Sequence, residues 1–159
     1  MLKYDTHHYD DFLKLKISAS LWFFLLYGVR HFFFVAAIKL MPNDVGSIDW
    51  MNTQANSLFM LTDIPAAIAL LATGHRVPDA FAIMRWVWAH GKSILISSYI
   101  LGIALYVHLN GALIQSGDID KLLLAASVII PDVLIIGSIF KSELIKDIFS
   151  EFPEPEKKD

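Results

Sequence analysis

The chain has 159 residues, of which 55% are hydrophobic, 18% charged and 13% aromatic, and its mean hydropathy is +0.52. A soluble domain has roughly a quarter charged residues, so this composition predicts a membrane protein. The absence of cysteine excludes disulfides, thiolate nucleophiles and cysteine-ligated metal sites, and a net charge of -3 without a dense basic stripe argues against nucleic-acid binding.

Four apolar runs follow one another along the chain, each about as long as the roughly 20 helical residues that cross a hydrocarbon core. Unbroken runs of this kind are typical of helices, because strands of a membrane barrel would alternate in short segments. We therefore expect an all-α polytopic membrane protein, with four transmembrane helices in an antiparallel bundle and a single domain over residues 1–159. The predicted spans are residues 17–40, 55–73, 93–113 and 122–140.

The basic residues predict the orientation of these spans, because lysine and arginine near span ends are retained in the cytoplasm. Ten of them fall on one side: Lys3, Lys14, Lys16, Arg76, Arg85, Lys92, Lys141, Lys146, Lys157 and Lys158. Only Lys39 and Lys121 fall on the other, and Arg30 lies within the first span. We therefore expect both termini to be cytoplasmic.

The segments outside the spans predict membrane-surface elements. Residues 78–92 and 141–152 are expected to form short amphipathic cytoplasmic segments, the second because its apolar residues recur at helical spacing. The charged, proline-containing stretch 153–159 predicts a flexible tail. A basic and aromatic interface is expected from His75, Arg76, Arg85, Trp86, Trp88 and Lys92.

Ionisable residues inside the spans are the candidate site, because charges near the bilayer centre are costly and need partners or water. From a rise of about 1.5 Å per residue, the heights above the inner surface are about 20 Å for Arg30, 21 Å for His31, 18 Å for Asp63, 15 Å for Asp132 and 22 Å for His108. We therefore expect one polar layer, in which the five donors of Arg30 bridge two carboxylates. Tyr27, one turn below, could donate to a carboxylate as well. Since one arginine cannot neutralise two aspartates, either one aspartate is protonated or a histidine is charged.

Three interpretations of this layer remain open. It can hold the helices together by hydrogen bonds, a role also indicated by the small residues Ser98 and Gly102. It can form a proton or solute pathway, because Pro65 and Pro131 are expected to break helices beside the aspartates and free backbone carbonyls. It can hold a haem between His31 and His108, although two histidines without further spacing are a weak signal. No metal site is predicted.

Three stretches carry a resemblance to a known family: LKLKISASLWFFLLYGVRHFFFVAA, DIPAAIALLATGHRVPDAFAIMRW and IIPDVLIIGSIFKSELIKDIFSEFP. The chain from Asp10 to Pro153 resembles a family of small four-span bacterial inner-membrane proteins that is known as a domain of unknown function. The likeness lies chiefly in Trp22, Arg30, Asp132 and the stretch from Pro65 to Arg76. The resemblance implies a location in the bacterial inner membrane and no particular activity.

The sequence contains no catalytic motif, so we expect no enzyme. The leading hypothesis is a multi-pass accessory or scaffold subunit, which contacts the lipid bilayer and either a protein partner or further copies of itself. The alternatives are a small proton- or solute-conducting module and a haem-binding redox protein. No cofactor is expected under the leading hypothesis.

Overall fold

The computed structural model describes residues 3–10, 13–40, 57–115 and 117–154, with the side chain of residue 113 left out. These residues form seven α-helices, one short 3-10 helix and no strand beyond an isolated bridge between Tyr9 and Leu15. The elements are η1 (Thr6–His8), α1 (Ala19–Gly28), α2 (Arg30–Leu40), α4 (Ser57–Gly74), α5 (Ala82–Ala89), α6 (Gly91–Gln115), α7 (Ile119–Lys141) and α8 (Glu143–Ser150). The prediction of an all-helical protein is therefore confirmed for the described part of the chain.

Three helices, α4, α6 and α7, are long and apolar enough to cross a membrane. They match three of the predicted spans within a few residues, although residues 55–56 of the second span lie outside the described ranges. The first predicted span differs, because α1 and α2 meet at an angle of 56°. The fold therefore has three candidate spans, or four if the bent pair counts as one.

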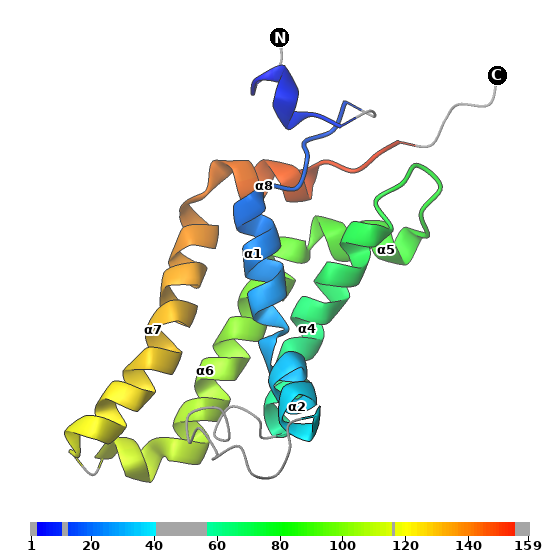
Figure 1. The fold of residues 1–159 in the computed structure, drawn as a ribbon. Coiled ribbons are helices and arrows are strands. Elements are labelled where there is room, and N and C mark those ends of the chain that lie inside the picture. The colour runs from blue at the N-terminus through cyan, green and yellow to red at the C-terminus, as the bar shows by residue number, and fades with distance from the viewer. Residues whose placement is uncertain (1–2, 11–12, 41–56, 116, 155–159) are drawn as a thin grey trace, which may run out of the picture.

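The long helices run beside one another, and α2 turns away from their common direction (Figure 1). α1 approaches α4 closely at Gly28, where an added Cβ would lie 2.8 Å from the Cβ of Ala66. Contact at this distance leaves no room for a side chain. Gly28 therefore permits α1 to pack directly on α4.

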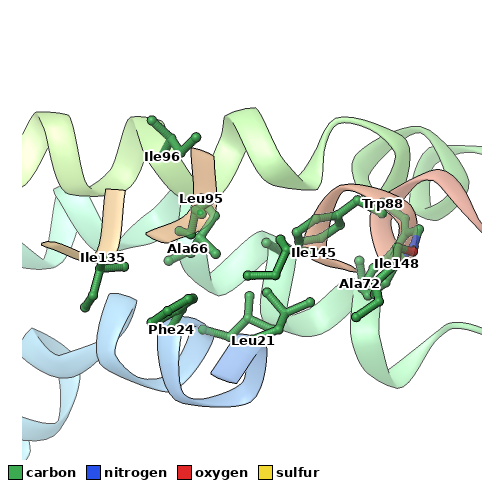
Figure 2. Packing of buried hydrophobic residues seen from close by; sticks show 14 of the residues in the cluster. Leu21, Phe24, Ala66, Ala72, Trp88, Leu95, Ile96, Ile135, Ile145 and Ile148 are labelled. Atoms are coloured by element: carbon green, nitrogen blue, oxygen red, sulfur yellow. The ribbon is translucent and has the colours of Figure 1, made fainter. Parts of the chain in front are cut away.

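The main hydrophobic core joins α1, α4, α6 and α7 to the short helices α5 and α8. Figure 2 shows Leu21, Ala66 and Leu95 facing one another between the long helices, with Ile148 and Trp88 at one end of the cluster. A smaller cluster, Phe59, Tyr106, Ala125 and Val128, lies separately from this core. The core therefore ties the span helices to the helices at one end of the molecule.

At that end, the described parts of both chain termini meet α5 and α8 (Figure 1). We call this region, residues 3–10, 13–18, 75–90 and 143–154, the cap. The Nε1 of Trp88 donates to the carbonyls of Ile148 at 3.0 Å and Glu151 at 2.9 Å. The carboxylate of Glu151 in turn accepts the backbone N–H of Leu15 at 2.8 Å. Glu151 therefore contacts both the N-terminal segment and α5.

Three sequence predictions fail in this fold. The helix breaks predicted at Pro65 and Pro131 do not occur, since both residues lie inside continuous helices. Proline removes one hydrogen bond, but the remaining bonds of a membrane helix meet no competition from water.

Trp88 is not a surface anchor, because α8 covers it and leaves it 1% exposed. The flexible tail does not begin at Pro153, which is buried and accepts a bond from Arg85 at 3.0 Å, and residues 155–159 lie outside the described ranges.

Candidate functional site

The site lies where α1 ends and α2 begins, and its first contact joins α2 to α7. The Nη2 of Arg30 lies 2.8 Å from the Oδ2 of Asp132. The side chains are 11% and 1% exposed respectively, so this ion pair is almost fully removed from solvent. Because the pair is buried, the loss of either partner would leave an uncompensated charge.

The second contact joins α2 to α4 through the next residue of the chain. The carboxylate of Asp63 accepts the backbone N–H of His31 at 2.8 Å, and its other oxygen lies 2.7 Å from the ring Nδ1. Both side chains are nearly inaccessible, at 2% and 3% exposure. The Arg30 guanidinium therefore does not bridge both aspartates as expected, because each carboxylate has a partner of its own.

These contacts give the bend its physical cause. Asp63 accepts one of the free N–H groups at the beginning of α2, while the Nη1 of Arg30 donates to the Tyr27 carbonyl at the end of α1, 3.3 Å away. A carboxylate thus meets the positive end of one helix dipole and a guanidinium the negative end of the other. The break replaces lost backbone hydrogen bonds with charged partners, as the interior of a membrane requires.

Hydroxyl groups on α4 and α6 surround this layer. Tyr99 donates to the Phe24 carbonyl at 2.5 Å, and Ser98 donates to the Thr62 carbonyl at 2.5 Å. Gly102 lies close by, since a Cβ there would be 3.9 Å from the Oδ2 of Asp132. Sequence reasoning named Ser98 and Gly102 for helix packing but missed Tyr99 and Thr62. The spacing from Ser98 to Gly102 could have predicted Tyr99, because it indicates which face of α6 packs near the charged layer.

One atom of the layer lacks a partner. Among the described residues, the Oδ1 of Asp132 has no hydrogen-bond partner, although this atom is buried. Most buried polar atoms in proteins are hydrogen-bonded, so this oxygen keeps an unused capacity to accept a bond. Asp132 is therefore the chemically unsatisfied member of the layer.

Two predicted members take other positions. Tyr27 contributes its ring, over which the Arg30 guanidinium lies at 4.4 Å, and its carbonyl, instead of a hydroxyl bond to a carboxylate. His108 is exposed on α6 and lines an apolar groove of about 440 Å³ between α4 and α6, together with Leu58, Leu61 and Thr62. The depth of a residue along its helix does not specify the direction in which its side chain points, and His108 points outward.

The histidines do not fit a haem held between two axial ligands. His31 is buried, is engaged by Asp63 and stacks on Phe59 with ring centroids 5.0 Å apart. His108 lies in different surroundings on the exposed face of α6. The described residues also contain no group of three or more side chains that could hold a metal ion.

The predicted basic and aromatic interface divides into buried and exposed parts. Arg76 is held inside the cap, where it stacks over Trp88 at 5.2 Å and donates to the Leu15 carbonyl at 2.5 Å. Arg85 donates to the carbonyls of Pro78, Ala80 and Pro153. His75 and Trp86 form the exposed part, and Lys92 is half-buried, with its Nζ 3.5 Å from the Phe140 carbonyl oxygen.

Comparison with known proteins gives one result that bears on identity. No curated protein and no solved structure matches the chain. A family model described as "Protein of unknown function (DUF2919)" matches residues 4–151, which confirms the resemblance to a domain of unknown function. The match covers nearly the whole chain, and the protein therefore belongs to this family.

Proposed function

We propose that the protein is a non-catalytic scaffold or accessory subunit of the bacterial inner membrane. The observation that carries this proposal is that two consecutive residues of α2, Arg30 and His31, each reach a carboxylate on a different helix. Paired charges and hydrogen bonds hold membrane helices together where the hydrophobic effect offers no drive. The layer thereby serves to fix the arrangement of α2, α4 and α7.

We further propose that both termini are cytoplasmic. The described basic residues of the majority side gather at the cap end of the bundle, and Lys121 lies at the opposite end, where α7 begins (Figure 1). This distribution follows the retention of basic residues in the cytoplasm. Reporter fusions after Pro78 and after Ser150 test the proposal. Activity of both reporters on the outer side would contradict it.

A surface for a partner helix is available on α7. This helix packs mainly against α6, and it exposes a run of large apolar side chains: Leu123, Ile130, Val133 and Leu134. An apolar helix face in a bilayer contacts either lipid or another helix. For a scaffold subunit we propose a protein partner or a second copy within the membrane, and α7 is a face that either such a helix or lipid can cover.

Isosteric variants of the layer test the scaffold role. Asp63→Asn keeps the shape of the side chain and one acceptor oxygen, and it should leave the chain in the membrane with its bound partner. Asp132→Asn leaves the buried Arg30 guanidinium without its counter-charge, so it should lower the amount of folded chain but not change which partner the folded chain retains. The measurement is purification from native membranes in mild detergent, followed by identification of retained proteins in the wild type and both variants. Retention of the same partner supports the proposal, and a chain purified without any partner or second copy contradicts it.

The unpartnered Oδ1 of Asp132 favours a second candidate, a proton-conducting module. A carboxyl group with one free oxygen can take up and release a proton, and intramembrane carboxylates do so in pumps and transporters. Proton flux into proteoliposomes at several pH values tests this candidate. It predicts flux that Asp132→Asn abolishes when equal amounts of folded protein are compared, whereas absence of flux at every pH refutes it.

A further inference from the structure

A polar pocket of about 370 Å³ lies where α1 begins and α4 ends, apart from the charged layer. It is lined by Asp10, Lys16, Ile17, Trp22, Thr73 and Arg76. Its walls therefore combine two basic side chains, a hydroxyl group, a carboxylate and two apolar side chains. Such a mixture is typical of a site for an amphipathic ligand.

The pocket is at the depth of lipid headgroups if the long helices cross the membrane. Ile17 immediately precedes Ser18, the N-cap of α1, and Thr73 lies in the last turn of α4. Trp22, one turn into α1, is 41% exposed. Tryptophan is enriched at the boundary between headgroups and hydrocarbon, so its position here agrees with an interfacial pocket.

The charges of the pocket favour an anion. The Arg76 side chain is only 6% exposed, and its Nε is buried without a hydrogen-bond partner among the described residues. Burial lowers the pKa of Arg76, and the nearby Asp10 and Glu151 carboxylates only partly oppose that effect. The closest carboxylate oxygen, on Asp10, is 3.9 Å from the Arg76 Nη1. This guanidinium is therefore only loosely paired with a carboxylate.

Two further features add to the attraction. Lys16 is exposed at the pocket wall, and no described carboxylate lies within ion-pair distance of its ammonium group. The first turn of α1 begins next to Ile17, and the N-terminal end of a helix attracts negative charge. The carboxylate of Asp10 is the opposing contribution, and its proximity to Arg76 offsets one of the two positive charges.

We propose that this pocket binds the phosphodiester group of a membrane phospholipid. The phosphate lies between Lys16 and Arg76, and the glycerol and the upper acyl chain contact Ile17 and Trp22. The inference rests on the proposed membrane placement but not on the scaffold role. The lipid would fasten the beginning of α1 to the end of α4 at the membrane surface.

Native mass spectrometry of the delipidated full-length protein, in a detergent without phosphate, tests the proposal. The probes are phosphatidylglycerol and a diacylglycerol with the same acyl chains, which lacks the phosphate. Phosphatidylglycerol should bind at least about tenfold more tightly, the effect of one charge-assisted hydrogen bond. Equal binding of the two lipids would overturn the proposal.

Variants of Lys16 separate the site from general attraction to the surface. Lys16→Gln should weaken phosphatidylglycerol binding about tenfold, and Lys16→Arg should restore it, because the charge returns. Lys121→Gln, at the other end of the bundle, removes the same charge and should leave binding unchanged. Wild-type affinity in Lys16→Gln, or an equal loss in Lys121→Gln, would overturn the proposal.

Inorganic phosphate distinguishes a lipid from a free anion. At millimolar concentration it should not displace phosphatidylglycerol, because it lacks the chains that contact Ile17 and Trp22. Displacement that depends on Lys16 would overturn the lipid assignment in favour of a free phosphate site. The scaffold role would be unaffected by that result, because partner retention is measured separately.

Discussion

Arg30 at the helix break and Arg76 in the cap are both largely buried, with side-chain exposures of 11% and 6%. Arg30 meets a buried carboxylate at 2.8 Å. Arg76 instead donates to the backbone carbonyls of Leu15 and Glu151, and its nearest carboxylate is 3.9 Å away. The comparison shows that the charge between the candidate spans meets a close counter-charge, while the charge in the cap is held chiefly by backbone carbonyls.

The helix break and the cap also differ in whether a substitution can remove the partner of a buried polar side chain. The break depends on side chains at both ends of each contact, Arg30 with Asp132 and His31 with Asp63. In the cap, Arg76, Arg85 and Trp88 all donate to backbone carbonyls. Since every residue has a carbonyl, the accepting positions of the cap tolerate a change of side chain. The break should therefore be the more sensitive region.

The largest effect is expected for Asp63→Ala. The change removes the carboxylate that contacts both the ring and the backbone N–H of buried His31. The free energy of unfolding should fall by about 3 kcal/mol or more. Denaturant unfolding in detergent measures it. Asp79→Ala, on an exposed residue of the loop before α5, is the control and should change stability by less than about 0.5 kcal/mol. Equal effects of the two variants would refute the assigned role of the pair.

Glycine-to-alanine substitutions at Gly28 and Gly91 allow the bundle and the cap to be compared directly. A Cβ at Gly28 would meet the Cβ of Ala66 at 2.8 Å, whereas a Cβ at Gly91 would overlap the ring of Phe149 on α8. Gly28→Ala should lower the unfolding free energy of the bundle by about 1–3 kcal/mol, because α1 and α4 must separate. Gly91→Ala should chiefly displace α8, which limited proteolysis after α7 detects. Gly137→Ala, with no atom near its Cβ, is the control and should not destabilise either region.

A smaller and local effect is expected for Trp88→Phe. The change replaces the indole with a smaller phenyl ring, so the N–H bonds to Ile148 and Glu151 are lost and a gap is left in the core. The cost should be about 1–2 kcal/mol. Hydrogen exchange should accelerate in residues 143–151 and not in α4 or α6. Trp86→Phe, on an exposed tryptophan, provides the comparison. A uniform change across the spans would show that the cap and bundle unfold as one unit.

The smallest effect concerns pH. The Lys3 ammonium, 2.7 Å from the Asp147 carboxylate, and the Tyr4 hydroxyl hold the pKa of Asp147 below its usual range. The docking of residues 3–10 should therefore be complete above the unfolded pKa of about 3.9 and weaken as the pH falls through the lower folded pKa. Hydrogen exchange of this segment between pH 5 and pH 3, corrected for intrinsic rates, measures it. Asp147→Asn should remove the dependence, and its persistence would refute the assignment.

The helices of this fold are largely predictable from the sequence, but the bend is not. Apolar runs locate α4, α6 and α7, since a lipid-exposed helix must be apolar along its whole length. The residues of α1 and α2 form one such run, so hydropathy predicts a straight span there. The bend at Val29 depends on Asp63, a residue of another helix. No local pattern carries that information.

For the candidate site, the sequence predicts which residues share a layer but not which residues pair. The estimate of depth placed Arg30, His31, Asp63 and Asp132 in one layer, and the structure brings them together as two pairs. The choice of partners depends on the rotation of each helix about its axis, which depth does not specify. For the same reason His108 matches in depth but faces outward. The burial of Trp88 was not predicted, because the eight residues of α5 are too few for helical periodicity to show which of its two tryptophans is buried.

The bent pair also constrains the order in which the chain can assemble during synthesis. N-terminal elements emerge first, and Arg30 precedes its partner by 102 residues and His31 precedes Asp63 by 32. Until α4 arrives, Arg30, His31 and the N–H groups at the beginning of α2 lack these partners, and they are costly to place in hydrocarbon. α2 must therefore remain in hydrated surroundings while the following helices are made. Entry of α4 provides the first partner, and entry of α7 completes the neutralisation, so the bundle closes only when nearly the whole chain has been synthesised.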